Sequence, residues 1–135
     1  MYRLLIVAFL LVGARSFAQD GPVIWIDLVK IKDGNAAEAM YFYENNWKVY
    51  RDSAQKIGLI TSYKLLRNTT DTAKADILLV TEYPSRKVFE DREQYWQPLM
   101  KALRPNGPVV LNGKKRDEFL TIVDSYLLAV VGQSK

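Results

Sequence analysis

The chain has 135 residues, of which 49% are hydrophobic and 25% are charged, and its formal net charge is +4 at pH 7. It contains no cysteine and no histidine. These absences exclude disulfides, thiolate nucleophiles, Ser-His-Asp and Cys-His catalysis, and most zinc and copper sites. Basic and acidic residues alternate along the chain, so the charge does not favour a nucleic-acid partner. We therefore expect one small domain that is held together by its core, with no metal and no cofactor.

The first residues have the pattern of a secretory leader. Arg3 precedes an apolar run from Leu4 to Ala14, and Ser16 and Ala18 form a small-x-small cleavage site. The run is about half of the roughly twenty apolar residues that span a membrane. A retained membrane anchor and a buried core helix are the alternatives. We expect cleavage after Ala18, which leaves residues 19–135 as a single secreted or periplasmic domain without membrane association.

The mature chain is predicted to begin with a strand and a long helix. Residues Val23 to Lys32 are rich in β-branched and aromatic side chains and predict a strand that ends at Asp33. The next apolar residues are spaced alternately four and three apart, which indicates one stripe on a helix. Gly58 suits the left-handed position that ends such a helix. The stripe consists of Ala36, Met40, Tyr43, Trp47, Tyr50, Ala54 and Ile57.

Two further strands and a second helix follow. Strands are predicted from Leu59 to Arg67 and from Ala75 to Tyr83, and the short polar link between them favours a hairpin. Ser85 is a suitable N-cap for the second helix, and Pro98 is expected to kink or split that helix near Trp96. The apolar stripe of this helix contains Val88, Phe89 or Arg92, Trp96, Leu99 and Leu103.

The last part of the chain is predicted to be a loop and one more strand. The segment from Arg104 to Pro108 ends the second helix, and a loop follows to Phe119 with one short helical turn near Asp117. A strand is expected from Leu120 to Val131. The order strand, helix, strand, strand, helix, strand predicts an α+β fold: the ferredoxin-like βαββαβ arrangement, a four-stranded antiparallel sheet with both helices on one face.

The strands are apolar on both sides, which indicates that both faces of the sheet are covered. In the first strand Ile24, Ile26 and Leu28 lie opposite Trp25, Val29 and Ile31, and in the last strand Val123, Leu127 and Ala129 lie opposite Ile122, Leu128 and Val130. A sheet face that meets water normally alternates polar and apolar residues. We therefore expect a homodimer that is formed face to face through the sheets. The alternative is that the loop after Pro105 covers this face.

Several polar and aromatic residues are candidates for a ligand site. Aromatic residues on the first helix can form a wall for a flat apolar ligand, Arg51 can bind an anionic group, and strand tyrosines can present hydroxyls to a cavity. Core packing and surface ion pairing are the alternatives for these residues. Asp27 and Asp124 interrupt apolar strands, and if they met in a buried place one of them would be a candidate base. The candidate ligand-binding residues are Tyr43, Trp47, Arg51, Tyr63, Tyr83 and Tyr126.

Three stretches of the sequence resemble a known superfamily. FYENNWKVYRDSAQKIGLITSYKLLRN (Phe42 to Asn68), LLVTEYPS (Leu78 to Ser85) and RPNGPVVLN (Arg104 to Asn112) are similar to uncharacterised exported bacterial proteins of the dimeric α/β-barrel superfamily. That superfamily includes the antibiotic-biosynthesis monooxygenases and the EthD-like, haem-degrading and NIPSNAP proteins. The resemblance implies a ligand pocket between the sheet and the helices of one subunit. Its haem-degrading members use a histidine, which this chain lacks.

These observations leave three hypotheses for the function. The first is an exported homodimer that binds a small, mostly apolar or aromatic molecule. The second is a cofactor-free monooxygenase that acts on a phenolic substrate, as some members of the superfamily do with Asn, Trp, Tyr or Arg side chains. The third is a structural or interaction module with a filled core. No catalytic residue is assigned from the sequence.

Overall fold

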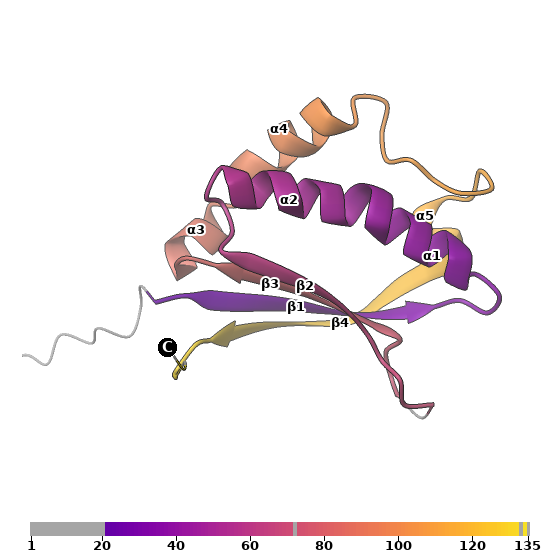
Figure 1. Ribbon diagram of the computed structural model, residues 1–135, viewed down its shortest axis with the longest axis horizontal. Coiled ribbons are helices and arrows are strands. Elements are labelled where there is room, and N and C mark those ends of the chain that lie inside the picture. The colour runs from indigo at the N-terminus through magenta and orange to yellow at the C-terminus, as the bar shows by residue number, and fades with distance from the viewer. Residues whose placement is uncertain (1–20, 72, 133, 135) are drawn as a thin grey trace, which may run out of the picture.

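The computed structural model describes residues 21–71, 73–132 and 134. The predicted leader lies outside these residues. Helices lie together on one side of a sheet whose other side is open (Figure 1). None of the described helices is long and apolar enough to cross a membrane. The elements are β1 (Val23–Ile31), α1 (Ala36–Phe42), η1 (Tyr43–Trp47), α2 (Lys48–Lys56), β2 (Ser62–Arg67), β3 (Ile77–Tyr83), α3 (Arg86–Glu90), α4 (Glu93–Leu103), α5 (Arg116–Phe119) and β4 (Leu120–Ala129).

The sheet confirms the predicted fold class. Its order is β2-β3-β1-β4, and every neighbouring pair is antiparallel. The strands β3 and β1 therefore lie in the centre, and β2 and β4 form the edges. This is the ferredoxin-like arrangement.

The first helix is continuous but changes its winding. A π-helical turn, η1, separates α1 from α2. The predicted stripe is buried across this turn at Tyr43, Trp47, Tyr50 and Ala54. Its two end members are exposed, since Ala36 is the first residue of α1 and Ile57 lies just beyond α2. Gly58 has φ +74°, as the predicted left-handed position requires.

The second helix is split, but not where the sequence predicts. Ser85 caps α3 by accepting a hydrogen bond from the amide of Val88 at 3.2 Å. The helix is then interrupted at Asp91 and Arg92, and Pro98 lies inside α4. The expected split near Trp96 is therefore wrong, because α4 continues from Glu93 to Leu103. Because the break falls just upstream, Pro98 occupies the second turn of α4, where its missing N–H removes only one intrahelical bond.

The face of the sheet opposite the helices is apolar, as predicted. Ile26 lies beside Val80 on one neighbouring strand and beside Tyr126 on the other. The assignment of sides in β4 is wrong for its first half, since a bulge at Val123 shifts the register and brings Ile122 to the helix side, opposite Val29. The apolar residues of this open face are Ile24, Ile26, Leu28, Leu66, Leu78, Val80, Tyr126 and Leu128.

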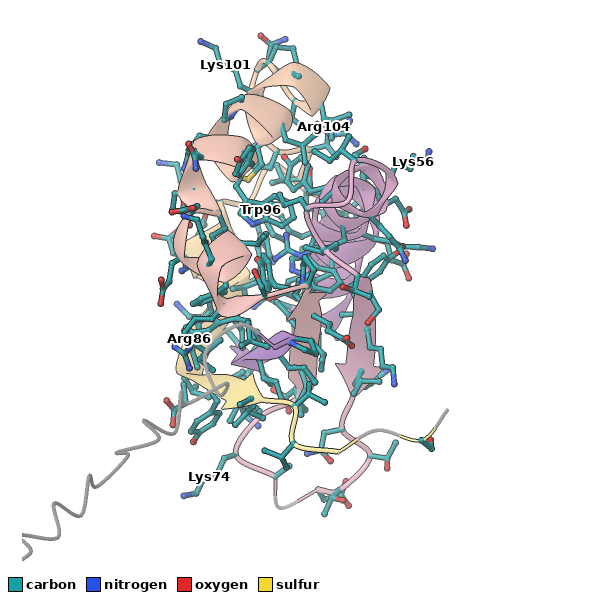
Figure 2. All side chains as sticks on the ribbon, turned by 90° about the vertical axis from the view of Figure 1, so that its left-hand side faces the viewer. Lys56, Lys74, Arg86, Trp96, Lys101 and Arg104 are labelled. Carbon is teal, nitrogen blue, oxygen red and sulfur yellow. The ribbon has the colours of Figure 1, made fainter. Side chains whose placement is uncertain are left out.

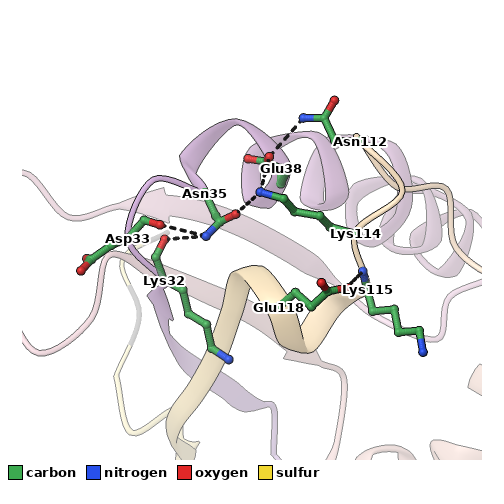
Figure 3. Close-up of polar contacts among 8 residues, drawn as sticks. All are labelled: Lys32, Asp33, Asn35, Glu38, Asn112, Lys114, Lys115 and Glu118. Carbon is green, nitrogen blue, oxygen red and sulfur yellow. Dashed lines mark hydrogen bonds and ion pairs between the residues drawn. The ribbon is translucent and has the colours of Figure 1, made fainter.

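The long loop after Pro105 does not cover the open face. It is attached to the first helix on the other side of the molecule (Figure 1). The buried side-chain amide of Asn46 donates to the carbonyl of Val109 at 2.7 Å and accepts from its N–H at 2.8 Å. Further along the loop, Lys114 forms an ion pair with Glu38 at 2.8 Å, and Asn112 donates to the same carboxylate (Figure 3). Among the described residues the open face therefore has no cover.

Candidate functional site

A cleft of about 230 Å³ opens between the sheet and the helices α2 and α4. The central strands β1 and β3 form its floor, and the facing sides of the two helices form its walls. Figure 2 shows Trp96 pointing from α4 toward α2, between the two helices. Aromatic and charged side chains are mixed in its lining, which consists of Trp25, Arg51, Tyr83, Arg92, Glu93, Trp96 and Met100.

Arg51 has an unusual environment for an arginine. Its guanidinium carbon lies 4.8 Å from the ring centre of Trp47 and 4.2 Å from that of Trp96, so the cation lies between two indoles. Its Nε donates to the hydroxyl of the buried Thr81 at 3.1 Å. Burial lowers the pKa of Arg51 to about 10, which still leaves the group charged at neutral pH.

The open edge of this guanidinium faces the cleft. None of the ion pairs among the described residues involves Arg51. The two terminal nitrogens of Arg51 have no hydrogen-bond partner among the described residues. Solvent reaches them, because among these residues only Nε of Arg104 is a side-chain nitrogen or oxygen that is both buried and without a partner. The α2 helix therefore holds a fixed cation with free donors in the cleft.

A second arginine enters the cleft from the start of α4. The guanidinium of Arg92 lies 3.8 Å above the ring of Phe89 and 5.7 Å from the ring of Trp25. It donates to the carbonyl of Phe89 at 2.7 Å and lies 3.7 Å from the carboxylate of Glu93, which is largely exposed. Arg92 is thus held by stacking and by a backbone bond, and its pairing with Glu93 is loose.

A buried hydrogen bond closes the bottom of the cleft. The indole Nε1 of Trp96 donates to the hydroxyl oxygen of Tyr83 at 3.0 Å. Tyr83 is fully buried, and burial raises the pKa of its hydroxyl. The hydroxyl is therefore neutral at any ordinary pH and serves as a hydrogen-bonding group rather than as a base.

The structure brings some of the predicted ligand-binding residues together and separates others. Arg51 and Tyr83 line the cleft, and Trp47 lies behind Arg51. Tyr43 belongs to the buried cluster around Phe119, where burial raises the pKa of its hydroxyl. Two further residues, Tyr63 and Tyr126, lie elsewhere.

The hydroxyls of these two tyrosines are already bonded to carboxylates. Tyr63, on the edge strand β2, donates to Asp52. Burial, and then this hydrogen bond, raise the pKa of Tyr63 to about 12. Tyr126 lies on the open face and donates to Asp124 at 2.6 Å. Neither residue lines the cleft.

The two strand aspartates do not meet. They lie on adjacent strands, but Asp27 pairs in register with Ser125 on the helix side, and Asp124 pairs with Leu28 on the open face. One oxygen of Asp27 accepts hydrogen bonds from Trp25 at 3.0 Å and from Ser125 at 2.5 Å. The pKa of Asp124 is lowered by its bond from Tyr126. A shared proton between the two carboxylates is therefore excluded.

The rest of the described surface offers a weaker site. A larger groove of about 650 Å³ lies where β1 ends beside the β2–β3 hairpin. Its lining contains no aromatic residue, and one of its three cations, Lys30, is paired with Asp76 at 3.0 Å. The described residues contain no cluster of three or more acidic side chains that is arranged to hold a metal.

Five residues of the cleft were not predicted from the sequence as ligand-binding: Trp25, Arg92, Glu93, Trp96 and Met100. One signal was available. Arg92 is spaced four residues before Trp96 on the apolar stripe of the second helix, and a charged residue on a buried stripe needs a partner. Trp25 gives no such signal, because an aromatic residue in a strand is ordinary core material.

Comparison with known proteins supports the fold. No protein-family model and no curated protein matches the sequence. A dimeric protein of unknown function and ferredoxin-like fold from Bacteroides fragilis NCTC 9343 superposes with a TM-score of 0.50 at 14% identity, over 82% of this chain and 95% of that one.

Two proposed monooxygenases superpose less well. One, from Shewanella loihica PV-4, gives a TM-score of 0.48 at 16% identity, over 84% of this chain and 98% of that one. The other, a proposed antibiotic-biosynthesis monooxygenase from Caulobacter crescentus CB15, gives 0.47 at 14% identity, over 85% and 94% of the two chains. The sheet order and the likeness to the Bacteroides fragilis protein show that the chain has the ferredoxin-like fold.

Proposed function

We propose that this protein binds a small molecule with an aromatic or otherwise apolar body in the cleft between the sheet and the helices. The observation that carries the proposal is the lining of the cleft, in which Trp25, Trp96 and Met100 surround a few fixed polar groups. Ligand sites combine apolar walls with a small number of placed polar groups in this way. A volume of about 230 Å³ lies below the range of drug-sized sites, which favours a compact ligand.

The third hypothesis, a structural module, required a filled interior. The open cleft favours ligand binding over this hypothesis, and two arginines would be a poor choice of residues for filling a core.

We propose further that two copies associate through the open face. The occupant is a second copy because the chain's own long loop lies on the helix side, and because a twofold contact places the same apolar rows against each other. The Bacteroides fragilis protein of the same fold is described as dimeric. An uncovered face with Leu66, Tyr126 and Leu128 each more than 40% exposed would be a liability for a monomer.

Native mass spectrometry of protein that is purified from its own host tests both proposals. We expect a dimer that carries a small molecule, and release of that molecule on gentle activation. A monomer at high concentration would contradict the dimer. A ligand-free spectrum, together with no binding of aromatic compounds in titrations, would contradict the binding function. The same spectrum tests export, since the mature mass should lack residues 1–18.

A second candidate function is oxidation of a phenolic ligand by O₂ in the same cleft. The candidate base is Asp27, whose carboxylate lies on the helix side of β1 and has one oxygen without a partner among the described residues. Asp27 is not itself a lining residue of the cleft, but its charge acts on Arg51, which is. With anthrone as substrate, the ring CH₂ would become a carbonyl; one oxygen atom of O₂ would enter the product and the other would leave as water. Oxygen uptake above the buffer blank that is lost in Asp27→Asn would support this reaction. Uptake at the blank rate would exclude it for this substrate.

A further inference from the structure

The residues that line the cleft carry one more positive than negative charge. Arg51 and Arg92 face it with Glu93 as the one acidic lining residue. The carboxylate of Glu93 lies 3.7 Å from Arg92 and belongs to that arginine rather than to Arg51. Asp27 acts on Arg51 from the floor, but its hydrogen bonds are directed to Trp25 and Ser125. Arg51 is therefore the cation without a direct counter-ion.

A guanidinium without a counter-ion destabilises the ligand-free protein. Removing a guanidinium from water without a counter-ion is unfavourable, and the lowered pKa of Arg51 reflects this cost. The two flanking indoles recover a part of the cost. Core packing alone does not explain an arginine here, since a leucine or methionine would fill the same space between Trp47 and Trp96 without the penalty.

The geometry of the guanidinium defines what would satisfy it. Its Nε donates to Thr81, and its contacts with the Trp47 and Trp96 rings hold the group in place. The remaining edge presents parallel N–H donors to the cleft, which is the arrangement that a carboxylate accepts in a bidentate pair. Trp25 and Met100 line the space beyond this edge, and both suit the face of an aromatic ring.

We infer that the ligand is a small aromatic carboxylic acid whose carboxylate is bound by the free edge of Arg51. This inference rests on the proposed binding function and adds the chemical class of the ligand. Arg92 contributes long-range attraction at the mouth of the cleft, while Arg51 forms the direct bonds. A monoanion matches the single excess positive charge of the lining, and a single or fused pair of rings suits the small volume.

Calorimetric titration with matched pairs of compounds tests the inference without any variant. The acids are phenylacetate and 2-naphthoate, and their neutral partners are phenylacetamide and 2-naphthamide, which keep the ring and shape. Acetate tests the carboxylate without a ring. We expect each acid to bind at least tenfold more tightly than its amide, because hydrogen bonds to charged partners are the stronger ones. Acetate should bind far more weakly than either aromatic acid.

A variant pair then assigns the effect to Arg51. Arg51→Gln should weaken binding of the acids about ten- to a hundredfold and leave binding of the amides nearly unchanged. Lys56→Gln is the matched control, since it removes the same charge from an exposed position near the end of α2, pointing away from the cleft (Figure 2). Circular dichroism and the melting temperature establish that each variant is folded.

The outcomes separate the class of ligand from the binding function itself. Amides that bind as tightly as the acids would overturn the inference and leave the binding function intact. The same holds if Arg51→Gln weakens acids and amides equally, because the residue would then act only through the shape of the cleft. If neither acids nor amides bind and the protein from its host carries no small molecule, the binding function and the inference both fail.

Discussion

The indole Nε1 of Trp96 donates to the hydroxyl oxygen of Tyr83 at 3.0 Å, and this buried bond joins α4 to the central strand β3. The same Trp96 ring lies 4.2 Å from the guanidinium carbon of Arg51 on α2. One side chain therefore connects both helices and the sheet. The position of Arg51, and with it the polar edge of the cleft, depends on this bond.

Tyr83→Phe should lower the free energy of unfolding by about 1–3 kcal/mol, since it leaves the buried Trp96 donor without a partner. Chemical denaturation measures the change. Tyr95→Phe is the control, because Tyr95 lies on the same helix as Trp96 with 49% of its surface exposed and should change stability by less than about 0.5 kcal/mol. An equal loss of unfolding free energy in the two variants would show that the buried hydrogen bond does not stabilise the protein more than an exposed hydroxyl does.

Asn46→Ala should destabilise the protein by about 2 kcal/mol, because Asn46 bonds both backbone groups of Val109 and the carbonyl of Phe42. Asn45→Ala is the matched control at the next position, where the side chain makes one bond, to the carbonyl of Tyr41. Hydrogen exchange should accelerate at the amide of Val109 in the first variant only. Unchanged exchange there would contradict the proposed attachment of the loop to the helix.

Stability should fall in acid as Glu38 is protonated. The hydrogen bond from Lys114, and then that from Asn112, lower the pKa of Glu38 from its usual 4.5 to about 2 (Figure 3). The folded pKa is below the unfolded one, so the contribution is fully present above about pH 4.5 and is lost as the pH falls through 2. The free energy of unfolding, measured between pH 5 and 2, should decrease as the pH falls.

Variants of two neighbouring lysines assign the acid effect. Lys114→Met should remove most of this component of the slope, because it removes the largest cause of the lowered pKa. Lys115→Met should retain it, since the Lys115 side chain points away from Glu38 (Figure 3). A slope that is the same in both variants would assign acid sensitivity to other carboxylates.

Ile26→Lys should convert the proposed dimer into a monomer. Ile26 lies on a central strand between Val80 and Tyr126, so a charge there would be buried without a partner in a face-to-face contact. Size-exclusion chromatography with light scattering measures the mass. Thr69→Lys, in the exposed turn of the hairpin, adds the same charge away from the face and should leave the dimer unchanged. A dimeric Ile26→Lys variant would place the contact elsewhere.

The sequence predicts the order of elements and both faces of the sheet because these depend on local composition and on alternation. It does not predict the π-helical turn or the bulge at Val123, since each is a one-residue change of register that tertiary packing selects. It also does not predict that the second helix is interrupted at Asp91 and Arg92. The residues of the candidate site likewise differ in whether the sequence alone could identify them. Arg51 was identified from its own chemistry, whereas Trp25 acquires its place only when β1 pairs with β3.

The pairing of β1 with β4 has a consequence for engineering. Val23 lies opposite Ala129, and the amide of Val130 donates to the carbonyl of Pro22 at 3.2 Å. The start of β1 and the end of β4 therefore lie side by side. A short glycine linker can therefore join them, and new termini can be opened in the exposed hairpin turn at Thr69. Such a circular permutant should keep the cleft and its three neighbouring tryptophans intact, while a reporter domain that is fused at the new termini would extend from the opposite end of the sheet.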